Sequence, residues 1–292
     1  MKNVLVVLGN GFDLDLGLKT SYINFWSSKK DSIQKIYLNR GSRYKLSKPS
    51  LAKQIDQYIY SWGDLEDIIR VHASGTVQHE EEPAIRIWRL AELTAHNNIS
   101  ANEEYFNILK QELISYLEEQ QNQQINEESK AAKFLRQLSF LEEDKLNIFN
   151  FNYTDINEFA KKININQTFE VSYIHGNLKE KNIILGVGED RLYEGYGFVL
   201  KKVQGAKISP IEEALLQADE IVFYGVSFGF NDFQYFKEFF LAIKEGKLKT
   251  TINIYTKDEQ STENIFHRLS AVGVTKRDLY INANLHIEQT MK

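Results

Sequence analysis

The sequence predicts an α/β protein with a mostly parallel β-sheet and helices on both faces. Short runs of apolar, often β-branched residues recur along the chain, and segments with apolar residues at helical spacing separate them. Glycine-rich or polar motifs directly follow several of these runs. A strand buried on both faces of a parallel sheet carries a continuous apolar run, and strands that alternate with helices are typical of α/β folds.

Six segments have the apolar character of buried strands: Val4–Leu8, 146–151, 169–174, 182–187, Glu220–Tyr224 and 251–255. Between the last two, residues 232–244 place phenylalanines at helical spacing, and Gly246 marks the expected end of that helix. Residues 265–272 have the pattern of another amphipathic helix.

The first two predicted strands are separated by more than a hundred residues, whereas a βαβ unit needs only about 30. Three groups of apolar residues in this interval have helical spacing: Leu51, Ile55, Tyr58 and Ile59; Ile85, Trp88 and Leu90; and Tyr105, Phe106, Leu109, Leu113 and Leu117. We therefore predict a core formed by residues 1–27 and 141–292, and a large helical insertion over residues 28–140 that adds no strand to the sheet.

Composition and charge exclude several classes of protein. The 292 residues carry a formal net charge of −5, whereas general nucleic-acid binding is associated with a basic excess. The absence of cysteine excludes disulfides, thiolate nucleophiles and cysteine metal sites, and the six histidines lack metal-ligand spacing. No apolar stretch approaches the roughly 20 residues of a membrane span. We expect a cytoplasmic protein without a metal or a membrane partner.

Gly9-Asn10-Gly11 directly follows the first predicted strand and opens a helix. In a Rossmann-like turn, glycines let the backbone approach a phosphate, which then meets the N-terminus of the helix. The third glycine of the usual motif is replaced by Leu14, and a tight strand-to-helix turn is the alternative interpretation. We predict a phosphate-binding turn in which Asp13 either caps the helix or meets a ribose hydroxyl.

Two further motifs follow predicted strands. Asn150 and Asn152 could orient a sugar hydroxyl or a water, although asparagine is also common in turns. His175 precedes a glycine at the end of another strand, and the pKa of histidine suits proton transfer at neutral pH. A structural role for this histidine is the alternative.

Residues 225–229 match the letters of the Gly-x-Ser-x-Gly elbow of hydrolases. That fold requires a later acid and then a histidine at successive strand ends, a context that we do not find. We interpret Ser227 as a polar contact for a nucleotide and Asn231 or Asp232 as a helix N-cap. In a parallel, doubly wound sheet these motifs would all meet at the carboxyl edge, where such sheets bind ligands.

Five segments carry a resemblance to a known family: residues 8–22, 62–66, 151–154, 174–176 and 224–232. With these motifs the chain resembles the bacteriophage abortive infection family AbiH, which is itself distantly similar to the sirtuin-like NAD-binding domains of antiphage defence. The resemblance implies that Gly9 and Gly11 form a phosphate loop and that Ser227 and Asp232 lie near the adenosine end.

It further implies that Asn152 orients the ribose or water and that His175 is the general base. The sequence departs from sirtuins at Asp13, where they have a small hydroxyl residue, and at residues 20–22, where they have Asp-Phe-Arg. Without cysteines for the structural zinc module, we do not expect protein deacetylation.

The resemblance leads to the expectation of an antiphage protein that binds NAD or a related nucleotide and hydrolyses its N-glycosidic bond. A phage-encoded trigger is an expected partner, and a homo-oligomer is compatible with the sequence. The alternative is a nucleotide-sensing module without turnover, which would act through a phage or host protein bound to the helical insertion.

Overall fold

The computed structural model describes residues 2–39, 49–62, 64–74, 99–141, 146–188, 192–205 and 210–290. By its internal contacts the chain divides into two compact units. Residues 1–19, 120–180 and 208–292 form the first, here called the sheet unit, and residues 20–119 and 181–207 form the second, here called the helical unit.

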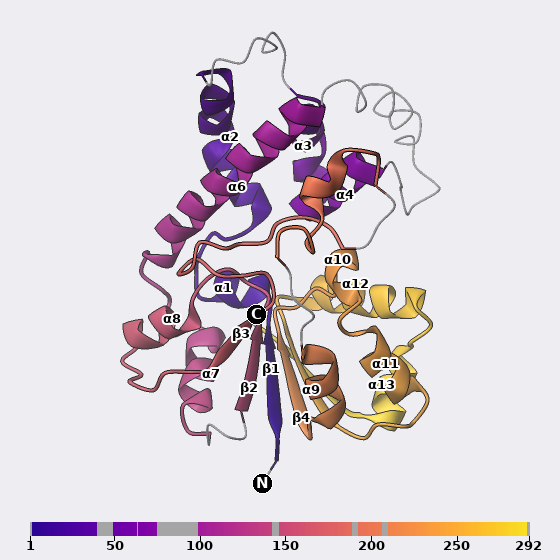
Figure 1. Ribbon diagram of the computed structural model, residues 1–292. Coiled ribbons are helices and arrows are strands. Elements are labelled where there is room, and N and C mark those ends of the chain that lie inside the picture. Colours follow the sequence, from indigo (N-terminus) through magenta and orange to yellow (C-terminus); the bar gives the residue numbers. More distant parts are fainter. Residues whose placement is uncertain are drawn as a thin grey trace. The chain divides into compact units, whose positions relative to one another are not determined.

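The sheet unit contains one six-stranded, all-parallel sheet in the order β3-β2-β1-β4-β5-β6, which confirms the predicted fold class. The strand order reverses between β1 and β4, as in Rossmann-like folds (Figure 1). The strands are β1 (Val4–Leu8), β2 (Leu146–Asn150), β3 (Val171–Tyr173), β4 (Glu220–Tyr224), β5 (Thr251–Thr256) and β6 (Asn284–Gln289).

Side chains alternate between the two faces of the sheet along each strand, and apolar residues point to both faces. Helices therefore cover both faces. Val6 and Leu8 belong to one apolar core, together with residues of α1, α7 and α8. Leu5 and Val7 belong to the opposite core, with residues of α9 to α13 (Figure 1). The helices are α1 (Asn10–Asp15), α7 (Lys130–Leu138), α8 (Ile156–Lys162), α9 (Ile211–Gln217), α10 (Phe230–Phe233), α11 (Lys237–Lys244), α12 (Glu259–Ala271) and α13 (Lys276–Asn282).

The predicted strand at 182–187 is wrong. Only Val187 makes an isolated bridge, to Leu200, and the segment belongs to the helical unit. Ile183, Leu185 and Val187 are fully buried, so the apolar run indicated burial correctly but not strand pairing.

Three further elements differ from the prediction. Strand β3 is shorter than predicted, and the predicted helix over 232–244 is divided into α10 and α11. Strand β6 was not predicted because Asn284–Gln289 contains only two large apolar residues. As an edge strand it pairs with β5 alone and needs no continuous apolar run.

The helical unit contains α2 (Tyr22–Asn39), α3 (Ser50–Trp62), α4 (Leu65–Ser74), most of α6 (Ile99–Gln121) and the 3₁₀ helix η2 (Tyr196–Val199). The predicted apolar faces of α3 and α6 are buried, whereas the group at 85–90 lies outside the described residues. Described residues between 28 and 140 form helices and turns, and none of them lies in a strand.

The domain boundaries drawn from the sequence stay a prediction. The contacts assign α7 to the sheet unit and residues 181–207 to the helical unit. Among the described residues, no helix has both the length and the apolar character that crossing a membrane requires.

Candidate functional site

The carboxyl ends of β1, β2, β3 and β4 are aligned. Leu8 pairs with Asn150 and with Tyr224, and Asn150 pairs with Tyr173. Adjacent strands lie about 4.8 Å apart, so the residues after β1 and those after β3 are separated by about 10 Å. Motifs from distant parts of the sequence therefore share one edge, at the reversal of strand order where open α/β sheets bind ligands.

The glycine turn after β1 packs directly against the turn after β4. The amide of Gly9 donates to Tyr224 O at 2.9 Å, and the amide of Gly11 donates to Gly225 O at 3.1 Å. A Cβ atom on Gly11 would lie 2.5 Å from the Cα of Gly225, which itself has φ of +64°. These contacts are those of a tight strand-to-helix turn, which was the alternative interpretation of the sequence.

The phosphate-binding role of this turn stays a prediction. Because the amides of Gly9 and Gly11 donate to backbone carbonyl oxygens, they are not directed at a ligand in this structure. Asn10, between them, is exposed. An anion at this turn would therefore have to be bound through Asn10 or after a rearrangement of the two glycine amides.

Asp13 is buried in α1, with 1% of its surface exposed. Its Oδ1 accepts a hydrogen bond from Asn152 Nδ2 at 2.9 Å, and its Oδ2 accepts one from Thr154 Oγ1 at 2.8 Å. Burial raises the pKa of Asp13 to about 7, against the two hydrogen bonds, which lower it. Gly9 is the N-cap of α1, so the helix-cap role considered for Asp13 is wrong, whereas the ribose contact stays a prediction.

Asn150, the last residue of β2, and Asn152, in the turn that follows, have different contacts. Asn150 is fully buried and braces its own turn: its Oδ1 accepts from the amide of Asn152 and its Nδ2 donates to Thr154 O, both at 2.9 Å. Asn152 directs Nδ2 to Gly9 O at 3.0 Å and to Asp13. Asn150 is thus the turn residue, and Asn152 keeps its Oδ1 as the side-chain atom that could meet a ligand.

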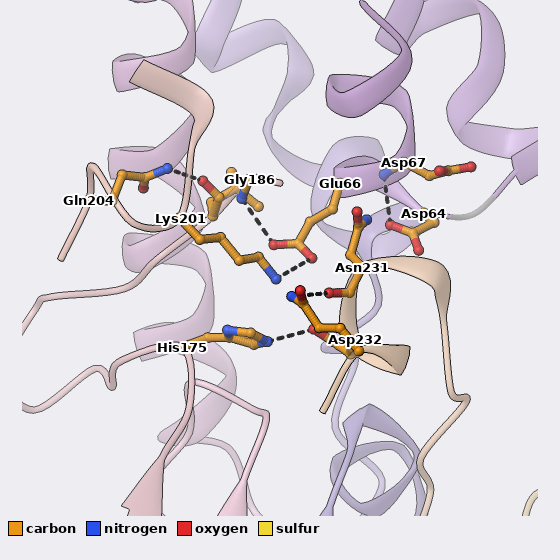
Figure 2. A network of polar contacts seen from close by, with 11 residues as sticks. Asp64, Glu66, Asp67, His175, Gly186, Lys201, Gln204, Asn231 and Asp232 are labelled. Atoms are coloured by element: carbon orange, nitrogen blue, oxygen red, sulfur yellow. Dashed lines mark hydrogen bonds and ion pairs between the residues drawn. The ribbon is translucent and has the colours of Figure 1, made fainter. Parts of the chain in front are cut away.

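His175, two residues after the end of β3, contacts Asp232 of helix α10. His175 Nε2 and Asp232 Oδ1 are 2.8 Å apart (Figure 2). An ionised carboxylate only accepts, so Nε2 carries the hydrogen and the lone pair of a neutral ring lies on Nδ1. The His175 side chain is 4% exposed and that of Asp232 is 29% exposed.

Aromatic rings border this pair. The ring of His175 lies edge-on to Phe151 at 5.4 Å between centroids, and the Tyr235 ring is 6.2 Å away. Gly229 is the N-cap of α10, and Asn231 and Asp232 both lie inside that helix, so the predicted capping role of Asn231 or Asp232 is wrong. Sequence reasoning missed the pairing of Asp232 with His175 because 57 positions separate the two residues and no local pattern links them.

Ser227 is exposed, and its carbonyl oxygen accepts a hydrogen bond from Arg268 Nη1 at 2.6 Å. Arg268, on α12, places a cation at the loop that contains Ser227. No feature of the sequence distinguished this arginine. The described residues contain no group of three or more histidines and acids arranged to hold a metal ion.

The helical unit contains its own buried polar contacts. Glu66 accepts from the amide of Gly186 at 3.0 Å and pairs with Lys201 at 3.1 Å (Figure 2). Elsewhere in this unit, His72 Nδ1 contacts Gln54 Oε1 at 2.9 Å and its Nε2 contacts Tyr196 Oη at 3.1 Å. Burial lowers the pKa of His72 to about 4.

Comparison with the curated proteins finds no match to the chain. The sequence model of a protein family described as "Bacteriophage abortive infection AbiH" matches residues 5–254. The match begins within β1 and ends within β5, and it contains every motif on which the resemblance in the sequence was based. The chain therefore belongs to the bacteriophage abortive infection AbiH family.

Proposed function

We propose that this protein acts in abortive infection by binding NAD or a related nucleotide at the carboxyl edge of its sheet and hydrolysing the N-glycosidic bond. The observation that carries the proposal is the 2.8 Å contact between His175 and Asp232 at this edge. Asn152 follows the neighbouring strand. A histidine oriented by a carboxylate is a common arrangement for a general base.

The substrate would be cleaved between C1′ of the ribose and the nicotinamide nitrogen. Nicotinamide leaves as a neutral molecule, and the ribose develops the charge of an oxocarbenium ion. A water molecule then attacks C1′ and loses a proton to Nδ1 of His175. This nitrogen is buried in the structure, so the ring would have to turn toward the ligand for the transfer. The products are ADP-ribose, nicotinamide and a proton. Asp232 would stabilise the imidazolium, and Asn152 Oδ1 would accept from the water or from a ribose hydroxyl.

The proposal is tested by incubating the purified protein with NAD and measuring free nicotinamide by chromatography. We expect His175→Ala to lower the rate by about 10²–10⁴-fold, the typical contribution of a general base. Asp232→Asn should also lower it, because an amide does not stabilise the imidazolium as a carboxylate does. His267→Ala, which changes an exposed histidine of α12, is the control.

Equal rates for His175→Ala and the wild type would contradict the assignment of the base. If a phage trigger is required, the same comparison is made in lysate from infected cells that contain each variant. Release of nicotinamide there by the wild type and by His267→Ala, but not by His175→Ala, would support the proposal.

A second candidate is a nucleotide-sensing module without turnover, acting through a phage or host protein. The burial of the His175 ring, 4% exposed beside Phe151, favours it, because a structural histidine is packed in this way. Two results together would support this candidate. Cells with the wild type would survive the phage with unchanged NAD, and cells with His175→Ala would lose this protection.

A further inference from the structure

Asp13 combines nearly complete burial with a carboxylate whose hydrogen-bond partners are the uncharged side chains of Asn152 and Thr154. Among the described residues, no lysine, arginine or histidine forms an ion pair with it. Its two oxygens accept instead from Asn152 Nδ2 at 2.9 Å and from Thr154 Oγ1 at 2.8 Å. Both donors lie in the turn after β2, whereas Asp13 lies in α1, so the carboxylate joins this helix to that turn at the carboxyl edge.

These contacts determine the direction of the Asn152 amide. Nδ2 donates to Gly9 O at 3.0 Å and to Asp13 Oδ1, which accounts for both of its hydrogens. A flipped amide would place Oδ1 against these two acceptor oxygens, which is unfavourable. With Nδ2 held inward, Oδ1 is the end of the amide left for a ligand.

The backbone of this turn is fixed by other means. Asn150 accepts from the amide of Asn152 and donates to Thr154 O, each at 2.9 Å. Loss of the Asp13 carboxylate would therefore leave the turn braced by Asn150 and release one hydrogen of the Asn152 amide. An effect of Asp13 on the Asn152 side chain can therefore be distinguished from an effect on the backbone of the turn after β2.

We propose that Asp13 is a positioning residue that holds Asn152 with its carbonyl oxygen presented to a hydroxyl donor of the ligand, either a ribose hydroxyl or the attacking water. An amide carbonyl oxygen only accepts hydrogen bonds, so this end of Asn152 selects a donor. The inference rests on the proposed function for the identity of the ligand. Asp13 itself does not touch the substrate.

The test compares Asp13→Ala with Asp13→Asn. Asparagine can accept from Asn152 through its carbonyl oxygen and donate to the Thr154 hydroxyl, which also accepts. It should therefore restore what alanine removes. Asp15→Ala is the matched control on α1, because the Asp15 carboxylate accepts from Tyr224 Oη and the amide of Ala131 instead.

Two measurements are made on each variant that retains the circular dichroism of the wild type. Hydrogen exchange of the Asn152 side-chain amide, followed by NMR, reports whether its two hydrogens remain hydrogen-bonded. Protection of cells against infection is measured as the plating efficiency of a phage that the wild type restricts. We expect Asp13→Ala to speed this exchange about tenfold or more and to weaken protection about 10²-fold, as for a misplaced catalytic group. Asp13→Asn and Asp15→Ala should remain close to the wild type in both.

A protected Asn152 amide in Asp13→Ala, or wild-type plating by that variant, would overturn the inference. Equal losses in Asp13→Asn and Asp13→Ala would also overturn it, because the charge and not the hydrogen bond would then matter. Failure of the proposed function gives a different result: the wild type would restrict the phage without cleaving NAD. In that case the exchange and plating differences between the variants would still decide the role of Asp13.

Discussion

Replacing Asp13 by asparagine removes a carboxylate from the interior of the sheet unit and keeps a side chain of the same shape. Asp13 is 1% exposed, and an amide can hydrogen-bond to both of its partners, Asn152 and Thr154. We therefore expect Asp13→Asn to fold and to differ from the wild type mainly in how its stability depends on pH.

The magnitude follows from the pKa. Burial raises the pKa of Asp13 from 3.8 to about 7, so between these values the native state holds a proton that the unfolded chain releases. The contribution of this group to stability is fully present below about pH 3.8 and is lost as the pH rises through about 7. A difference of about three pH units corresponds to about 4 kcal/mol, of which about 3 kcal/mol falls between about pH 5 and pH 8.

The assay is urea unfolding of both proteins at several pH values, followed by far-ultraviolet circular dichroism through the transition that removes the sheet. Taking the difference between the proteins cancels the opposite contribution of His72, whose pKa is lowered to about 4. The free energy of unfolding of Asp13→Asn, minus that of the wild type, should rise by about 3 kcal/mol from about pH 5 to pH 8. A difference that stays constant with pH would show that the pKa of Asp13 is not raised in the native state.

Three further substitutions test the packing. Gly225→Ala places a Cβ atom 2.4 Å from the Cα of Gly11 at a positive φ and should destabilise the protein by about 3 kcal/mol in urea unfolding; Gly197→Ala, where nothing lies within 4 Å, should have little effect. Glu66→Ala removes the carboxylate that pairs with buried Lys201 and should cost about 3–5 kcal/mol; an unchanged melting temperature would contradict this. Because burial lowers the pKa of His72 to about 4, its contribution to stability is lost as the pH falls from about 6.5 through 4. His72→Gln should therefore lose less stability than the wild type over that range in thermal unfolding, and equal losses would contradict the assignment.

The central strands could be predicted from the sequence because burial on both faces requires continuous apolar runs, as in β1 and β4. The same signal gave a wrong strand at 182–187, since an apolar run reports burial whether or not the backbone pairs. Strand β6 was missed for the converse reason, because an edge strand pairs on one side and tolerates polar residues.

At the candidate site, sequence reasoning could select His175 and Asn152 because each follows a predicted strand. The direction of their contacts could not be predicted, because it depends on residues far away in the chain. Asp232 lies 57 positions from His175, and Asp13 lies 139 positions from Asn152. Only the fold shows that Asp13 faces side chains of the next loop, and that the glycines after β1 meet the backbone after β4.

The hydrolysis of NAD by His175 is tested by measuring cellular NAD during phage infection, together with plating efficiency, in cells that contain equal amounts of wild type or His175→Ala. The proposed function predicts that NAD falls as the wild type restricts the phage, and that the variant preserves NAD and loses protection. Full protection by His175→Ala, or protection by the wild type without loss of NAD, would contradict it.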